Sequence, residues 1–499
     1  MMKFPVLHPN GRPVDRLASP AGWRIAIRAA ILTVCATTSV AWAQSEPGSA
    51  QDPAAQAEAG ESAPAQRGVS EWLREAAEAY YAEDHVRWVS ALENLHRLRP
   101  LNYDFMRQLV MGYALTERTS NAFEMMLRMQ RQGLAADWDS VDEVKSLRQY
   151  PLYGHLRDLM RDAGSPGGAA VTAFSIPPEH PMPEALAHDP GSGRIFVGTV
   201  HDGRILARIP GEREFEVFAD SAEVDGLTAV FDLLVDDQRG HLWAATGAIS
   251  QYRRARTQDI GRTALIQFDL ETGDKIGEYR VVPDGQPHLL GAMAMASDGT
   301  IYASDSFSPE IFRLTPGAER PVSIGGHPML TGLRGVALSP DDQRLYVADY
   351  DLGVFFFALG EEVRLYSLGV PETLNLGGVD GLYTWSDDLV VIQNGVSPQR
   401  ILRLELDDSG TRVENIATLA RALPEFDTPT YGTVAGDDLL FLAASHWPRV
   451  DGKGRPVDPP LPEIPVLRAS ISDAEEIVVG QEMIDRIKTG ESPDSGGDD

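Results

Sequence analysis

Paired apolar segments separated by a tight turn recur along the last two thirds of the chain. The clearest pair lies in residues 332–350, GLRGVALSPDDQRLYVADY. There the pattern predicts a strand over Val336–Leu338, a turn over Ser339–Gln343 and a second strand over Leu345–Ala348. The second strands of the related segments have their first apolar residue at positions 195, 242, 301, 345, 389 and 439.

These six units predict a mainly β chain region folded as a six-bladed β-propeller over residues 171–485. The steps between units are 47, 59, 44, 44 and 50 residues, and the long step contains an insertion, AISQYRRARTQDIGR. One blade cannot bury its own core, so the blades must stack on one another around an axis. The segment AVTAFSIP (170–177) precedes the first unit and has no partner in this count. We expect it to supply the outer strand of the last blade.

Residues 69–163 change to a helical period and predict a small all-α domain before the propeller. A small residue followed at +4 and +7 by larger apolar ones occurs as Ala91, Leu95 and Leu98, and again 31 residues later as Ala122, Met126 and Met129. The pattern resembles divergent tetratricopeptide repeats, and YPLYGHLRDLM predicts a closing helix. The segment AGSPGGAA (163–170) is typical of a linker.

The first 43 residues have the pattern of a secretory signal peptide. Basic residues precede an apolar run that ends in Ala41-Trp42-Ala43, a small-x-small cleavage pattern. An uncleaved anchor helix is the alternative, although the run is short for a bilayer span. Residues 44–68 have hardly an aliphatic side chain, and the end of the chain, ESPDSGGDD, has a similar composition. This composition predicts a disordered linker over 44–68 and a disordered acidic tail over 486–499.

The net charge and the cysteine content limit the partners and the cellular compartments that the sequence predicts. The formal charge of −29 argues against nucleic-acid binding, which basic clusters would indicate. Cys35 is the one cysteine, so a chain cleaved after Ala43 would have no thiol and no disulfide. We therefore expect a periplasmic or secreted protein with no membrane attachment after signal cleavage.

Aligning the six units brings a ring of polar side chains to one face of the propeller. In such a fold the first strand of each blade lies innermost, so the residues where it begins converge. The ring consists of Glu184, Asp232 beside Phe231, Gly291 just after His288, Arg334, Asp380 and Tyr431, and Gln393 joins it from the end of a second strand. This ring predicts a binding site for a small polar ligand, with Arg334, His288, Asp232, Tyr431 and Gln393 as candidate contacts.

Three segments carry a resemblance to a known family. PEALAHDPGSGRIFVG, LRGVALSPDDQRLYVADY and VDGLYTWSDDLVVIQNG resemble the senescence marker protein and gluconolactonase-like six-bladed propellers. This resemblance implies a lactone hydrolase with one divalent metal ion, calcium or zinc. By position it implies that Glu184 and Asp380 are metal ligands and that Asp380 is also the catalytic base.

Two positions depart from the family pattern. Arg334 and Gly291 stand where the resemblance expects asparagines, and a guanidinium beside a metal position would repel the ion. The same guanidinium can bridge Glu184 and Asp380 by charge-assisted hydrogen bonds. Three interpretations follow: a ligand-binding protein with a degenerate metal site, a metal-dependent lactonase-type hydrolase, and an interaction scaffold whose helical repeats dock a protein. No nucleophile elbow, HExxH pair or phosphate loop occurs in the sequence.

Overall fold

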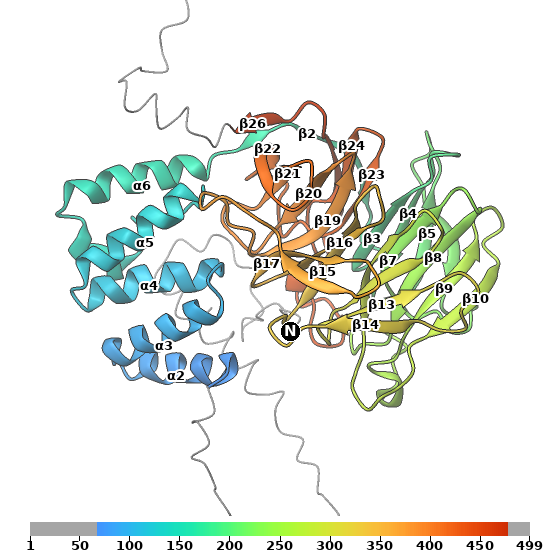
Figure 1. Ribbon diagram of the computed structural model, residues 1–499, viewed down its shortest axis with the longest axis horizontal. Coiled ribbons are helices and arrows are strands. Elements are labelled where there is room, and N and C mark those ends of the chain that lie inside the picture. Colours follow the sequence, from blue (N-terminus) through green and yellow to red (C-terminus); the bar gives the residue numbers. More distant parts are fainter. Residues whose placement is uncertain (1–66, 478–499) are drawn as a thin grey trace, which may run out of the picture.

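The computed structural model describes residues 67–477, which form a helical region followed by a propeller (Figure 1). The predicted signal peptide (1–43), the linker (44–68) except its last two residues, and the tail (486–499) lie outside the described residues. Between residues 67 and 477, no helix combines the length and the apolar character needed to cross a bilayer.

The helical region covers the predicted range. Its elements are α2 (Val69–Tyr81), α3 (His85–Leu98), α4 (Tyr103–Leu115), α5 (Thr119–Arg131), the 3-10 helix η1 (Asp142–Leu147) and α6 (Pro151–Ala163). Side-chain caps fix two of the starts, since Asp84 accepts from the Arg87 amide at 3.0 Å and Asn102 accepts from the Phe105 amide at 3.1 Å. Five of the six repeated small and large apolar positions form the core, since Ala91, Leu95, Ala122, Met126 and Met129 are fully buried, whereas Leu98 is only partly buried.

Residues 167–477 form six antiparallel sheets, which confirms the six-bladed β-propeller. The first three blades are built from β3 (Pro183–His188), β4 (Ile195–Thr199), β5 (Arg204–Arg208) and β6 (Glu216–Asp220); β7 (Ala229–Asp236), β8 (His241–Gly247), β9 (Thr263–Asp269) and β10 (Lys275–Arg280); and β11 (Leu290–Met295), β12 (Ile301–Asp305), β13 (Glu310–Leu314) and β14 (Val322–Gly326). All six residues used to count the repeats lie in the second strand of their blade.

Blades four to six complete the ring. They consist of β15 (Leu333–Leu338), β16 (Arg344–Asp349), β17 (Gly353–Ala358) and β18 (Arg364–Ser367); β19 (Val379–Trp385), β20 (Asp388–Gln393), β21 (Arg400–Leu406) and β22 (Val413–Arg421); and β23 (Gly432–Ala435), β24 (Asp438–Leu442), β25 (Ile464–Ser470) and β2 (Ala170–Ile176). Short 3-10 helices η2 (Thr257–Asp259) and η3 (Trp447–Arg449) lie in two connections. The first strands of neighbouring blades are adjacent all round the axis.

The N-terminal strand of the propeller closes the ring, as the unpaired segment predicted. Strand β2 pairs antiparallel with β25 from Ala170↔Ala469 to Ile176↔Ile464. The last blade is thus shared between the two ends of the propeller sequence. Opening the ring at this point would expose two strand edges.

The predicted linker at 163–170 contains a short strand instead. β1 (Gly167–Gly168) pairs with the outer strand β22 of blade five, which also pairs with β26 (Glu475–Ile477). A Cβ on Gly168 would lie 2.2 Å from the Leu419 carbonyl oxygen, and its φ of +74° favours glycine. Gly168 is therefore required for this close pairing with the backbone of β22.

Side-chain hydrogen bonds join the first or second strand of one blade to the first strand of a neighbouring blade. Each runs from a side chain to the backbone of an adjacent blade, so each also satisfies a backbone group. They are Asp232 to the Met293 amide (2.6 Å), Ser304 to the Arg334 carbonyl (2.7 Å), Thr384 to the Leu338 carbonyl (2.6 Å) and Tyr383 to the Gly432 amide (2.6 Å).

The helical region packs against blade five. Val396, in the turn after β20, belongs to the helical core, and the Ala135 amide donates to the Ser397 carbonyl at 2.6 Å. Figure 1 shows the helices at the side of the orange strands of this blade. The contacting turns stand where β19 begins and β20 ends. This face of the propeller, where first strands begin and second strands end, is called the mouth below.

Candidate functional site

The polar residues predicted at the mouth occupy equivalent positions in their blades. Glu184, Arg334 and Asp380 are each the second residue of a first strand, β3, β15 and β19. At each of them the pairing with the second strand is irregular, as it is at Phe231 and Gly291. Such bulges re-aim a side chain at the end of a strand. A repeated local irregularity thus brings these residues to one place.

Arg334 and Asp380 form a largely buried ion pair. Arg334 Nε lies 3.4 Å from Asp380 Oδ1, and their side chains are 11% and 16% exposed. The guanidinium also lies over the ring of Tyr350, 5.5 Å from its centroid. Burial lowers the pKa of Arg334 and the Asp380 charge raises it, with a net rise, so this arginine stays charged.

Asn394 holds the second oxygen of Asp380. Its Nδ2 donates to Asp380 Oδ2 at 2.7 Å and to the Pro429 carbonyl at 2.8 Å, and its Oδ1 accepts from the Tyr350 hydroxyl at 2.8 Å. Asp380 therefore has one oxygen beside a guanidinium and the other on an amide.

Glu184 lies apart from this ion pair and is held differently. The Trp447 indole Nε1 donates to Glu184 Oε2 at 2.9 Å, and Glu184 is buried. Burial, followed by the charge of Asp380, raises the pKa of Glu184 to about 8. Glu184 is thus protonated at neutral pH. The expected bridge from Arg334 to both carboxylates is not formed, because Arg334 makes its ion pair with Asp380 and Glu184 bonds to Trp447.

Asp232 and Tyr431 lie in the same electrostatic environment. Asp232 accepts from the amides of Met293 and Leu233, and burial raises its pKa to about 7. The ring of Tyr431 belongs to blade six but packs in the core between blades three and four. Burial first, then the charge of Asp380, raises the pKa of the Tyr431 phenol well above its ordinary value, and Arg334, Glu184 and Asp232 also act on it.

His288 and Gln393 have other partners. His288 is buried between two carboxylates, with Nδ1 2.6 Å from Asp305 Oδ2 and Nε2 3.1 Å from Asp284 Oδ1. Burial lowers the pKa of His288, the two carboxylates raise it, and the net shift is upward. Gln393 is fully buried, donates to the carbonyls of Asn375 and Gly377, and accepts from Arg400 at 2.6 Å. Two of these partners, Arg400 and Asn375, in turn bond to Gln132 of the helical region.

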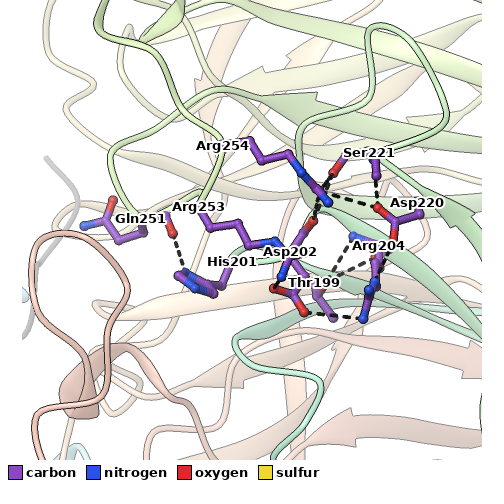
Figure 2. A network of polar contacts seen from close by, with 10 residues as sticks. Thr199, His201, Asp202, Arg204, Asp220, Ser221, Gln251, Arg253 and Arg254 are labelled. Atoms are coloured by element: carbon purple, nitrogen blue, oxygen red, sulfur yellow. Dashed lines mark hydrogen bonds and ion pairs between the residues drawn. The ribbon is translucent and has the colours of Figure 1, made fainter.

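The mouth over blades one to three is covered by apolar side chains. Phe231 and Leu289 pack with Ile249 and Tyr252 of the blade-two insertion and with Val450, and Trp447 packs against this cluster. Figure 2 shows the polar contacts that hold the insertion on blade one. They are Arg253 to Asp202 (3.3 Å), Arg254 to Ser221 (2.9 Å), the Gln251 carbonyl to His201 (2.7 Å) and, within blade one, Arg204 to Asp220 (2.7 Å).

The donors at the mouth are a poor set for a divalent metal ion. Two carboxylates are present, but Asp380 is paired with a guanidinium and Glu184 is protonated at neutral pH. A hard dication requires several oxygen ligands. Over residues 67–477, no three His, Cys, Asp or Glu side chains come together in an arrangement that could hold a metal ion.

Comparison with known proteins gives structural neighbours only. No protein-family model matches the chain, and no curated protein matches it. Similar solved structures include a luciferin-regenerating enzyme (14% identity, TM-score 0.44, 62% of this chain and 97% of the other) and a gluconolactonase from Xanthomonas campestris (15%, 0.39, 60% and 89%). A PQQ-bound aldose sugar dehydrogenase from Streptomyces coelicolor is also similar (15%, 0.42, 61% and 98%). At these values the likeness assigns no activity to this chain.

Proposed function

We propose that the mouth of the propeller binds a small polar, sugar-derived organic ligand and that it does so without a divalent metal ion. The observation that carries this proposal is the ion pair between Arg334 and Asp380, 3.4 Å apart and largely buried. The guanidinium supplies the positive charge that a metal ion would otherwise supply beside Asp380. The positive charge of Arg334 therefore already balances the negative charge of Asp380 before any metal ion is added.

Electrostatics favours this interpretation over the metal-dependent one. A dication and a guanidinium a few Å apart repel by several kcal/mol at an effective dielectric of about 20. Binding a metal on Glu184 would also require that carboxyl, whose pKa is raised to about 8, to lose its proton in a buried position. Repulsion by the guanidinium and the loss of the Glu184 proton both disfavour the binding of a metal ion. Neither effect disfavours the binding of a polar organic ligand.

The mouth offers the groups that a hydroxylated ligand requires. Protonated Glu184 is a hydrogen-bond donor, Asp380 is an acceptor, and the partly buried Trp447 beside Glu184 provides an apolar face against which a sugar ring can pack. The alternative is a lactonase-type hydrolase in which Asp380 is the general base and Glu184 a metal ligand. An interaction scaffold, with a protein docked on the helical region, is the third.

Metal analysis and thermal unfolding distinguish these functions. We expect purified protein to contain no stoichiometric divalent ion and to show no thermal shift with calcium or zinc. A panel of sugars, sugar acids and lactones should include a ligand that raises Tm in the native protein and not in Asp380→Ala. One divalent ion per chain, lost in Asp380→Ala and needed for lactone hydrolysis, would instead establish the hydrolase. Failure of the whole panel would favour the scaffold.

We also propose that the protein is exported to the periplasm or secreted, on the signal-like pattern of residues 1–43. Cell fractionation tests this, together with N-terminal sequencing of the mature chain. The expected first residue is Gln44. Full-length protein in the cytoplasm would contradict it.

A further inference from the structure

Two hydrogen-bond donors at the mouth have no acceptor in the part of the chain that the structure describes. Arg334 forms an ion pair through Nε, but within residues 67–477 no hydrogen bond reaches its guanidinium, and Nε itself is buried without one. The Tyr431 side chain is buried, with 8% exposure, and no hydrogen bond of its hydroxyl is formed with these residues. The charge of Arg334 acts on Tyr431, so the two donors lie in one electrostatic environment.

Within residues 67–477, the terminal nitrogens of Arg334 and the hydroxyl of Tyr431 form no hydrogen bond, so an acceptor from outside the chain can bind them. A buried donor without a partner is costly, and native proteins satisfy nearly all of them. Arg334 has only donors, and its terminal Nη1 and Nη2 form a planar fork that matches a carboxylate. The Tyr431 hydroxyl can donate to the same group. Neighbouring acceptors cannot take this place, because Asp380 already faces Nε of Arg334 and the amide of Asn394.

The terminal nitrogens of Arg334 can take a second, anionic acceptor beside Asp380, because the other carboxyl groups near them are protonated or held by amides. Three carboxyl groups act on Tyr431. Asp380 is already paired with Arg334, Glu184 is protonated at neutral pH, and Asp232 is held by the Met293 and Leu233 amides. A monoanion therefore meets no uncompensated carboxylate beside the guanidinium fork.

We infer that the ligand is a small hydroxylated carboxylic acid, such as a sugar acid, whose carboxylate is bound by the terminal nitrogens of Arg334 and the hydroxyl of Tyr431. This inference rests on the proposed binding function and specifies its ligand. The hydroxyls of the ligand then lie toward Glu184 and Asp380. An uncharged sugar lacks the one group that these donors require.

Calorimetric titration of the full chain with galacturonate and with its methyl ester tests the inference. The two probes differ by one charge and share their hydroxyls. We expect galacturonate to bind at least about 100-fold more tightly than the ester, in keeping with a charge-assisted paired contact. Arg334→Gln should remove this difference, and Tyr431→Phe, which deletes only a hydroxyl, should reduce galacturonate affinity about tenfold. Arg364→Gln, on the outer strand of the same blade, should change neither.

The remaining outcomes separate this inference from the proposed function. Equal binding of acid and ester, lost in Asp380→Ala, would overturn the carboxylate and keep the polar-ligand function. Equal binding of galacturonate, phosphate and sulfate would mean that any anion suffices, and would overturn a carboxylate-specific site. If Arg334→Gln does not fold, as circular dichroism would show, the Tyr431→Phe comparison decides. Absence of binding by all probes would contradict both proposals.

Discussion

The folded structure disfavours ionisation of the Glu184 carboxyl group. Its pKa is raised to about 8 from an ordinary 4.5 by burial and by the nearby charge of Asp380. A folded pKa above the unfolded one means that the folded state binds the proton more tightly between those two values. The stability that the proton provides is complete below about pH 4.5 and is lost as pH rises through about 8.

We therefore predict that the free energy of unfolding falls as pH rises from about 5 to 8, with a slope from Glu184 approaching 1.4 kcal/mol per pH unit. Denaturant unfolding across this range measures the slope. Asp232, whose pKa is raised to about 7, adds a decline of the same sign between about pH 4 and 7. Glu184→Gln keeps the shape and the hydrogen-bonding capacity, so it should flatten the part above pH 7. An unchanged slope in this variant would show that Glu184 titrates normally.

Substitution of Asn394 tests how much the polar network around Asp380 contributes to stability. Replacing it with alanine leaves Asp380 Oδ2, the Pro429 carbonyl and the Tyr350 hydroxyl each without this partner. We predict a loss of about 2–3 kcal/mol in the free energy of unfolding, since the three groups are in a largely buried site. Asn415→Ala is the control, because the exposed Asn415 side chain bonds to Glu405 at the surface and its loss should cost less than about 0.5 kcal/mol. Equal costs would mean that water replaces the Asn394 contacts.

The meeting of Arg334 and Asp380 could be predicted from sequence, and the partners of Glu184 could not. Both residues immediately precede a glycine at the start of a repeated strand, so aligning the repeats aligned them in space. Trp447 and Asn394 come from connections after second strands, where length and direction vary between blades. Which atom of Glu184 or Asp380 they reach depends on side-chain packing that no repeat encodes.

At the scale of elements, the blade-two insertion was visible only as a long step between repeats. In the structure it lies on blade one through two kinds of contact (Figure 2). Ile249 and Tyr252 are buried, whereas Arg253 and Arg254 keep 38% and 36% of their side chains exposed in their ion pairs. Exposed pairs contribute little, typically about 0–1 kcal/mol each. Apolar packing should therefore dominate.

We predict that the double change Arg253→Ala and Arg254→Ala raises hydrogen exchange in residues 250–260 about fivefold, while global stability stays within about 1 kcal/mol. Ile249→Ala should raise exchange more strongly, because it removes buried apolar volume. Arg256→Ala, which breaks an exposed local pair with Asp259, is the control and should have no effect. A larger rise in hydrogen exchange in the double arginine variant than in Ile249→Ala would show that the ion pairs, and not apolar packing, hold the insertion on blade one.

Repeat spacing predicted the blades because every blade packs against its neighbours in the same way, with similar strand and turn lengths. The short strand β1 escaped prediction since its two glycines are equally typical of a loop. Its pairing depends on the backbone of Leu419 and Ala420 in a strand more than 200 residues away. Contacts of this kind have no local signature.

At the scale of the whole molecule, Arg400 joins the propeller to the helical region. It lies on β21, is buried, and donates to the Gln393 side chain at 2.6 Å, the Gln132 carbonyl at 3.2 Å and the Asn375 carbonyl at 3.1 Å. Burial lowers its pKa to about 10, so it stays charged at neutral pH. Because Gln132 belongs to the helical region, this side chain links the unfolding of the two parts.

We predict that the native protein unfolds in one calorimetric transition and that Arg400→Met separates the transition of the helical region from that of the propeller. The change leaves three buried acceptors without their charged donor, at a cost of about 2–5 kcal/mol at the junction. Arg403→Met lies on the same strand but bonds within the propeller, to the Ile471 carbonyl and Asp388, so it should lower Tm without splitting the transition. A single transition in Arg400→Met would show that apolar contacts such as those of Val396 suffice to couple the two parts.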